Sequence, residues 1–145
     1  MHSRLRPLLL LLPLSAMVVT ACSDSTTTST TPTSIVTTTE TFTGTLTKNG
    51  AVTHQFSVTS RGTVTATLTK VDPDSTVAIG VSLGTWNGTT CQIILANDAA
   101  TVGNGVLGTV SGVGNLCLRV YDVGKLTTSE NYSVDVVHPW ELASW

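Results

Sequence analysis

The sequence predicts an all-β domain, an antiparallel sandwich of about eight short strands, and three observations support this fold class. Apolar and polar residues alternate with a period of two through much of 40–138. Gly, Asn, Asp and Pro recur between the alternating segments, as they do at turns. No segment there has the apolar period of a helix. Because only 11% of the residues are charged and 28 are Thr, the composition also excludes a long helical or coiled-coil protein.

Residues 1–21, which precede the domain, are typical of a bacterial lipoprotein signal peptide. Arg4 and Arg6 are followed by an apolar run of about a dozen residues, which is shorter than a membrane span. The run ends at 19–22, Val-Thr-Ala-Cys, which resembles the bacterial lipobox. The resemblance implies that the Cys22 thiol receives a diacylglycerol and that its freed amine is acylated, for example with palmitate. An ordinary secretory signal followed by a chance cysteine is the alternative.

The expected lipid anchor determines where the mature chain should be and what it should contact. Two or three acyl chains hold a protein stably at a membrane. In Gram-negative bacteria, an Asp directly after the lipidated Cys resembles an inner-membrane retention signal. This chain has Ser23 at that position instead, so the bacterial outer membrane or cell surface is favoured as its location. Without Arg4 and Arg6 the chain keeps five basic and nine acidic residues. That balance argues against nucleic acid as a partner.

A tether is expected between the lipid and the domain, over residues 22–39. After Cys22 it is almost entirely Thr and Ser, with one Pro and the lone apolar pair Ile35-Val36. Such a stretch buries too little apolar surface to offset the entropy of ordering it. We therefore expect a disordered spacer.

The domain itself is expected over 40–138. Its strands are predicted at 41–47, 52–59, 63–69, 77–83, 91–95, 106–110, 116–120 and 132–136.

The first three strands have the clearest alternation. In 41–47, Thr alternates with Phe, Gly and Leu, and Lys48–Gly50 after it is a hairpin turn signal. In 52–59, Val, His, Phe and Val share one face. Arg61-Gly62 then turns the chain, and 63–69 places Val, Ala and Leu inward. These segments predict three strands joined by tight turns.

The later strands are less regular. A loop at 71–75 precedes the fourth strand, which has Val, Ile, Val and Leu at alternate positions. The glycine-rich stretch 97–105 is expected to be an irregular loop. The segment after it, 106–110, has the weakest strand pattern of the eight. The last two strands alternate again, with Leu, Leu and Val in one and Tyr, Val and Val in the other.

With Cys22 assigned to lipid, Cys91 and Cys117 form an even pair in an exported domain, which predicts a disulfide. An unstrained bridge would contribute about 3–4 kcal/mol. Cys117 lies between Leu116 and Leu118 and so points away from the apparent core face. Either the bridge ties neighbouring strands on an outer face, or the assignment of faces is wrong there. A redox or metal-binding thiol pair is not favoured, since no Cys-x-x-Cys or clustered His accompanies it.

The domain resembles the bacterial pre-peptidase C-terminal (PPC) type. The stretches that carry the resemblance are the strand patterns at 41–46, 56–59 and 62–68 and the closing pair at 114–122 and 131–136. Leu116 replaces the Tyr usual after the glycine in the first of the closing pair. The resemblance implies a jelly-roll-like β-sandwich that serves as a non-catalytic accessory, secretion or surface-binding module, with no catalytic residue to carry over.

Candidate chemistry is sparse. His54 lies on an apparent inward face and is expected to be a half-buried strand histidine, while His138 is expected at the domain terminus. No nucleophile, zinc or phosphate-loop motif accompanies them, so we expect no enzyme and no cofactor. Asp72 and Asp74 flank a proline and are weak candidates for Ca²⁺, although such a turn needs no metal.

Trp86, in a loop before Asn87-Gly88, is the candidate ligand contact. It can stack on a sugar ring or cap the edge of the sandwich. A short aromatic tail follows at 139–145, and its role is open. Together these features predict a lipid-anchored cell-envelope protein whose sandwich binds a partner, either envelope proteins or polysaccharide. The alternatives are a structural envelope or matrix protein that interacts with other surface proteins and, least favoured, a carbohydrate-active or other enzyme.

Overall fold

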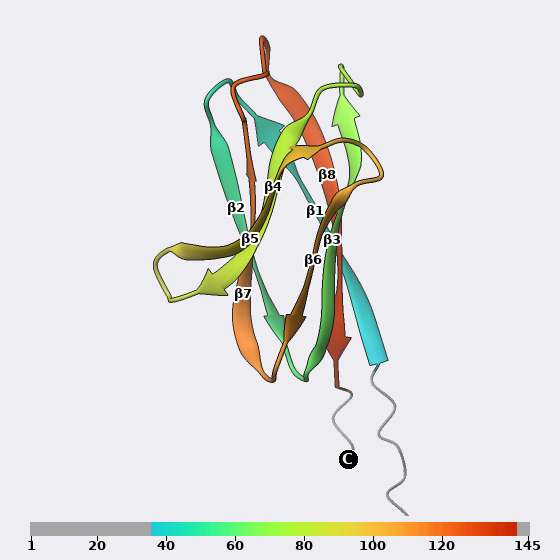
Figure 1. Cartoon of the computed structure of the whole chain (residues 1–145), viewed down its shortest axis with the longest axis vertical. Helices are drawn as coiled ribbons and strands as arrows, with labels where there is room; N and C mark the ends of the chain where they lie inside the picture. The colour runs from blue at the N-terminus through green and yellow to red at the C-terminus, as the bar shows by residue number, and fades with distance from the viewer. Residues whose placement is uncertain (1–35, 142–145) are drawn as a thin grey trace, which may run out of the picture. The chain divides into compact units, whose positions relative to one another are not determined.

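The structure, a computed structural model, describes residues 36–141. Two four-stranded antiparallel sheets pack face to face (Figure 1). The strands are β1 (Val36–Leu46), β2 (Ala51–Val58), β3 (Gly62–Asp72), β4 (Ile79–Trp86), β5 (Cys91–Ala100), β6 (Gly105–Val110), β7 (Gly114–Tyr121) and β8 (Glu130–Trp140). The predicted all-β sandwich of about eight strands is confirmed. In the described part of the chain, no helix is long and apolar enough to cross a membrane.

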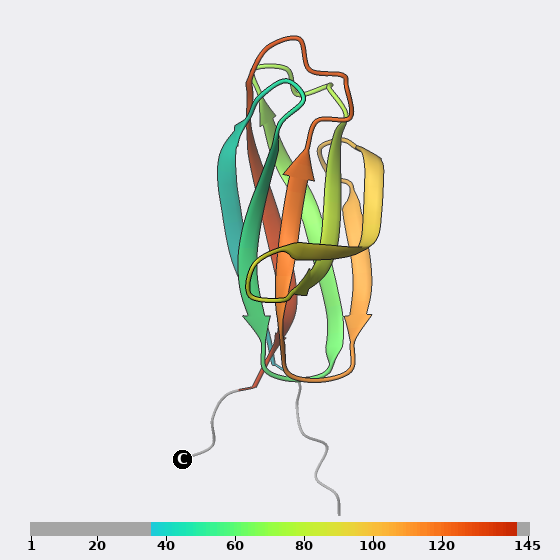
Figure 2. The same cartoon turned by 90° about the vertical axis from the view of Figure 1, so that its left-hand side faces the viewer.

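The strand order is that of a jelly roll. The first sheet has the order β1-β8-β3-β6 and the second has the order β2-β7-β4-β5. The pairs β1–β8, β2–β7, β3–β6 and β4–β5 therefore nest one inside the other along the sequence, as in a long hairpin folded over on itself. Figure 2 shows the second sheet from its outer side.

The turn predicted at Lys48–Gly50 is present, but it does not make a hairpin within one sheet. The amide of Gly50 donates to the carbonyl of Thr47 at 2.8 Å, and Asn49 has a left-handed φ of 56°. β1 pairs with β8, however, whereas β2 pairs with β7 in the other sheet. The hairpin expectation is wrong because a turn signal is local, while the sheet that a strand joins depends on distant partners.

The first and last strands of the chain are longer than the strands predicted at 41–47 and 132–136. β1 begins at Val36, within the stretch expected to be tether, and pairs with β8 from Val36↔Trp140 to Leu46↔Glu130. The strand continues this far because β8, itself extended to Trp140, offers a hydrogen-bonding edge. The predicted signal peptide, Cys22 and the rest of the predicted tether lie outside the described residues, as does the end of the tail.

The core lies between the sheets and follows the predicted alternation. Val64, Ala66 and Leu68, which were expected inward, are at most 2% exposed. The other fully buried apolar side chains include Leu46, Val58, Ile79, Val81, Leu118, Val120, Val134 and Val136. Burial of this kind on both inner faces is the main force that holds two sheets together.

Candidate functional site

The hairpin formed by β4 and β5 projects from the sandwich (Figure 1) and crosses in front of β7 when the second sheet is seen from outside (Figure 2). Its turn is capped by Asn87, whose Oδ1 accepts hydrogen bonds from the amides of Thr89 and Thr90 at 2.9 and 2.8 Å. Gly88 has a φ of 98°, which favours glycine. The turn is therefore held by its own residues.

The predicted disulfide between Cys91 and Cys117 is present, with the two Cα atoms 5.7 Å apart. Cys117 alternates along β7 with the core residue Leu118 and so lies on the outer face of the sheet. The assignment of faces made from the sequence therefore holds at this position. The bridge does not tie neighbouring strands, however. Cys91 is on β5 and Cys117 on β7, and β4 lies between them.

Gly84 explains how the bridge crosses β4. The pairing of β4 with β5 shifts register between Leu83 and Gly84, and Gly84 is the partner of Cys117 on β7. A Cβ on Gly84 would clash with the backbone of Gln92. The missing side chain lets β5 fold close over the sheet, which covers Cys117 completely although it is on the outer face.

A groove of about 520 Å³ opens beside this hairpin on the outer face of the second sheet. Gln55 and Ser57 on β2, Asn115 on β7, Trp86 at the end of β4 and Asn87 in the turn contribute to its lining. Ser57 is the cross-strand partner of Asn115, and its hydroxyl donates to Asn115 Oδ1 at 2.9 Å. Three adjacent strands and one turn thus build the site.

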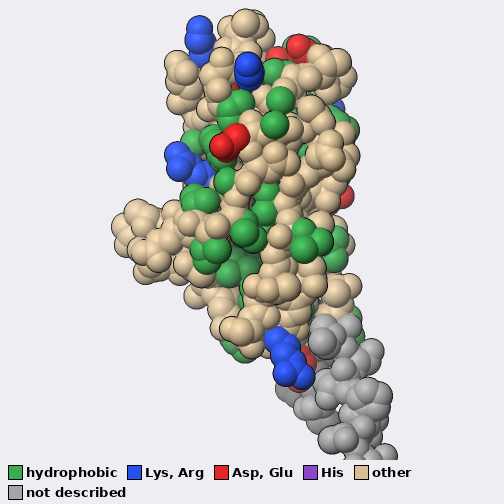
Figure 3. Space-filling view, viewed as in Figure 1, with side chains coloured by type: hydrophobic (Ala, Val, Ile, Leu, Met, Phe, Trp, Pro, Cys, Tyr) green, Lys and Arg blue, Asp and Glu red, His purple; other side chains and the backbone are tan. Residues whose placement is uncertain are grey.

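The groove offers hydrogen-bonding groups and an aromatic ring but no charge. None of the described residues that line it is charged, and Figure 3 shows the projecting hairpin without acidic or basic side chains. Asn115 keeps its amide donors free for a ligand, because its contact to Ser57 uses Oδ1. Gln55 is exposed, and Trp86 is half-buried. This arrangement suits binding, since no lining residue is an acid, a base or an activated nucleophile.

His54 packs between the two sheets. Its Nε2 lies 2.7 Å from the Tyr132 hydroxyl in a hydrogen bond, and its ring stacks on Phe42 with the centroids 5.0 Å apart. Burial lowers the pKa of His54 below 6.5 and raises the pKa of Tyr132 to about 12. His54 is half-buried, as expected from its inward position on the strand.

His138 lies near the end of the last strand, two residues before β8 ends at Trp140. It is fully buried in β8, where its Nε2 lies 2.9 Å from Glu40 Oε1. Its ring also packs near Phe56, with the centroids 5.3 Å apart. Because β8 pairs with β1, the strand continues past residue 136, where the alternation of apolar and polar residues ends.

Asp72 and Asp74 lie at a turn, and the backbone amide of Asp74 donates to Glu130 Oε2 on β8 at 3.0 Å. Asp74 Oδ1 accepts hydrogen bonds from the amide and hydroxyl of Thr76 at 2.9 and 2.7 Å, which lower the pKa of Asp74. Asp72 lies 3.8 Å from Lys70 Nζ. Among residues 36–141, no three His, Cys, Asp or Glu side chains are grouped as metal ligands would be.

Asp122 is a structural residue that the sequence analysis did not single out. Its carboxylate accepts four backbone amides, with Asn49 at 2.8 Å on Oδ2 and with Gly124, Lys125 and Leu126 at 2.8 to 3.1 Å on Oδ1. Desolvation opposes ionisation of this group, but the four hydrogen bonds together lower its pKa. The signal available was Asp-x-Gly at the end of a strand, which is typical of an Asx turn.

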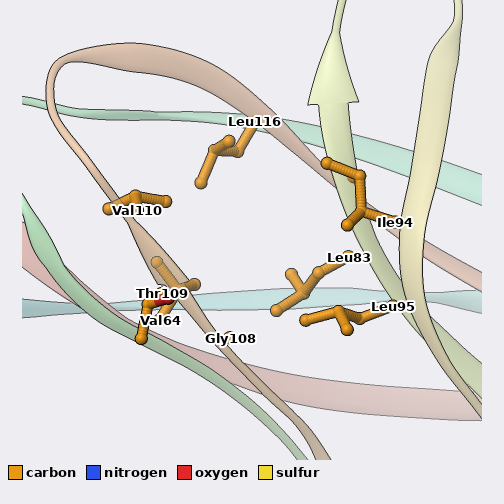
Figure 4. A pocket seen from close by; sticks show the side chains of 9 residues that line it. Val64, Leu83, Ile94, Leu95, Gly108, Thr109, Val110 and Leu116 are labelled. Carbon is orange, nitrogen blue, oxygen red and sulfur yellow. The ribbon is translucent and has the colours of Figure 1, made fainter.

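A second, apolar hollow lies where the open edges of the two sheets approach each other. The hollow has a volume of about 60 Å³, and its lining includes Leu83, Ile94, Leu95, Val64, Val110 and Leu116 (Figure 4). This volume is well below that of ligand pockets, which measure about 300–1,000 Å³. The surrounding surface remains apolar, because Ile94 on β5 and Leu107 on β6 are 66% and 65% exposed.

No protein-family model matches the chain, and no curated protein matches it. The chain is therefore described by its fold, an eight-stranded antiparallel β-sandwich with a disulfide between Cys91 and Cys117.

Proposed function

We propose that this chain is a lipid-anchored bacterial cell-envelope protein whose β-sandwich is a non-catalytic binding or accessory module. The lipobox-like segment that ends at Cys22 supports the anchor, and Ser23 favours the outer membrane or cell surface. The jelly-roll strand order is compatible with the resemblance to PPC-type domains, and membership of that group is part of the proposal.

The observation that carries the proposal is the uncharged groove beside Trp86. It lies on an outer face, and the disulfide and the Asn87 turn hold the hairpin that borders it. The two described histidines, in contrast, pack between the sheets against Tyr132 and Glu40. A rigid, exposed, uncharged site separated from the titratable groups favours binding over catalysis.

The apolar surface at the sheet edges favours a second candidate function, that of a structural protein which contacts other envelope proteins. Ile93, Ile94 and Leu95 on β5 are 39–66% exposed, and Leu95 lines a surface hollow together with Leu107 on β6. Exposed apolar edge strands are common sites of association between proteins.

The experiment that tests the proposed function is crosslinking in cells followed by pull-down of the full-length protein, with Cys22→Ser as the control. We expect a discrete envelope partner or cell-wall fraction with the wild-type chain, and its loss together with the loss of membrane fractionation in Cys22→Ser. If the wild-type chain is recovered in the soluble cytoplasmic fraction without lipid, the proposal is wrong. If Cys22→Ser is recovered in the membrane like the wild type, the anchor is wrong.

A further inference from the structure

We propose that the groove beside Trp86 is a binding site for a neutral polysaccharide, with the Trp86 indole as the stacking surface for one sugar ring. This inference rests on the proposed binding function and names the class of ligand. It commits to saccharide over a protein partner because of the composition, charge and shape of the groove.

The size and openness of the site suit a short stretch of sugar chain. At about 520 Å³ it lies within the range of small-molecule sites, and it lies at the surface, not in the core. Its lining residues come from β2, β7 and the end of β4, which are neighbours in the second sheet. A polymer can enter such a groove from the side, without the opening that an enclosed cavity would require.

The chemistry of the lining matches that of a sugar, which has apolar C–H faces and a rim of hydroxyls. The indole of Trp86 is half-buried and supplies a flat apolar surface together with an N–H donor. Gln55 and Asn115 supply side-chain amides, which donate and accept and so match hydroxyls that do both. Ser57 orients Asn115 through its hydrogen bond to Oδ1, which leaves the amide N–H groups for a ligand.

The charge of the lining selects among saccharides. With no basic residue in the described lining, the groove has nothing to pair with a uronate, sulfate or phosphate, whereas neutral hydroxyls need only the amides. An apolar protein surface would gain more at the edge around Ile94 and Leu107 than in this polar groove.

The site is also held in one shape before any ligand binds. The disulfide ties the turn end of the hairpin to β7, because Cys91 is the first residue of β5. Gly84 lets the hairpin lie close, and Asn87 closes the turn through Thr89 and Thr90. A preformed site avoids the entropy cost of ordering a loop on binding.

The test uses the full-length lipidated protein in a detergent without a sugar headgroup. The probes are insoluble cellulose and chitin, soluble dextran, laminarin and galactomannan, and alginate as an acidic comparison. We expect retention by at least one neutral probe. Trp86→Ala should weaken it at least tenfold and Asn115→Ala about threefold or more, while Trp86→Tyr should keep part of the affinity. Trp140→Phe, at the far end of β8, is the matched control and should bind as the wild type does.

Circular dichroism of each variant separates lost binding from lost fold, and Trp86→Tyr keeps the test valid if Trp86→Ala does not fold. The proposal is overturned if the wild type binds no neutral probe at millimolar sugar, if alginate binds more tightly than all of them, or if Trp86→Ala binds like the wild type. If these results occur while crosslinking still recovers a protein partner, the ligand class is wrong and the proposed binding function survives.

Discussion

β8 and β5 differ sharply in burial, although both are long strands with several apolar residues. Six of the eleven residues of β8 are buried, whereas only one of the ten residues of β5 is. β8 lies between β1 and β3, while β5 is an edge strand that pairs with β4 alone. The contrast teaches that position in the sheet, more than apolar content, separates the part of this molecule that holds it together from the part that can bind.

The largest loss of stability is expected when a charge is placed on an inward-facing position of β8. Val134 is fully buried, so Val134→Asp should lower the free energy of unfolding by more than about 4 kcal/mol and leave little folded protein. Val137→Asp is the matched control on the same strand, because Val137 is 37% exposed and its side chain points outward. Urea unfolding followed by circular dichroism measures both. Equal losses in the two variants would contradict the role assigned to β8.

Removal of the disulfide tests how the β4–β5 hairpin, which contains the exposed strand β5, is held in place. The double variant Cys91→Ala and Cys117→Ala should lose about 2–5 kcal/mol of stability. Because the bridge fixes the β4–β5 hairpin to β7, cleavage by chymotrypsin at Trp86 should also become faster. Cys22→Ser controls for the loss of a cysteine elsewhere in the chain. If the free energy of unfolding of the wild type were the same with and without reductant, the disulfide would not stabilise the fold.

Gly84 gives a smaller and more local test. Gly84→Ala introduces a Cβ that meets the backbone of Gln92, so we expect a loss of about 1–3 kcal/mol and displacement of the hairpin. Gly112→Ala, where a Cβ meets nothing within 4 Å, should change stability by less than about 0.5 kcal/mol. Thermal unfolding compares the two. Similar values for both would mean that the crossing over β4 does not depend on the missing side chain.

The smallest effect concerns pH and returns to the interior, where His54 on β2 meets Tyr132 on β8. Burial lowers the pKa of His54 from 6.5, so the unfolded chain binds this proton more readily than the folded one. Stability from this group is therefore present above pH 6.5 and is lost as pH falls through the lower, folded pKa. Urea midpoints between pH 7.5 and 5 should fall less in His54→Gln than in the wild type. An equal fall in both would assign the dependence to other groups.

Strand positions and the core were largely predictable because they depend on local alternation. The period of two placed Val64, Ala66 and Leu68 inward, and all three are buried. The disulfide was predictable from the parity of the cysteines, since only Cys91 and Cys117 remain once Cys22 is assigned to lipid.

The candidate site was only partly predictable. Trp86 was singled out because a Trp beside the Asn87-Gly88 turn signal can stack on a sugar ring, but Gln55, Ser57 and Asn115 carried no signal. They come together through the pairing of β2 with β7 and of β7 with β4, which joins residues about 30 to 60 positions apart. The start of β1 at Val36 was missed for the same reason, since its partner is Trp140.

Local sequence is enough to predict the all-β class, the inward faces of the strands and the identity of the bridged cysteines. Each of these follows from side-chain alternation or from counting, which act over a few residues or need no geometry at all. Pairing between distant strands sets the sheet that each strand joins, the path of the bridge across β4 and the groove that Trp86 borders with Asn115. These depend on backbone hydrogen bonds between distant segments, and backbone groups are the same in every residue but proline.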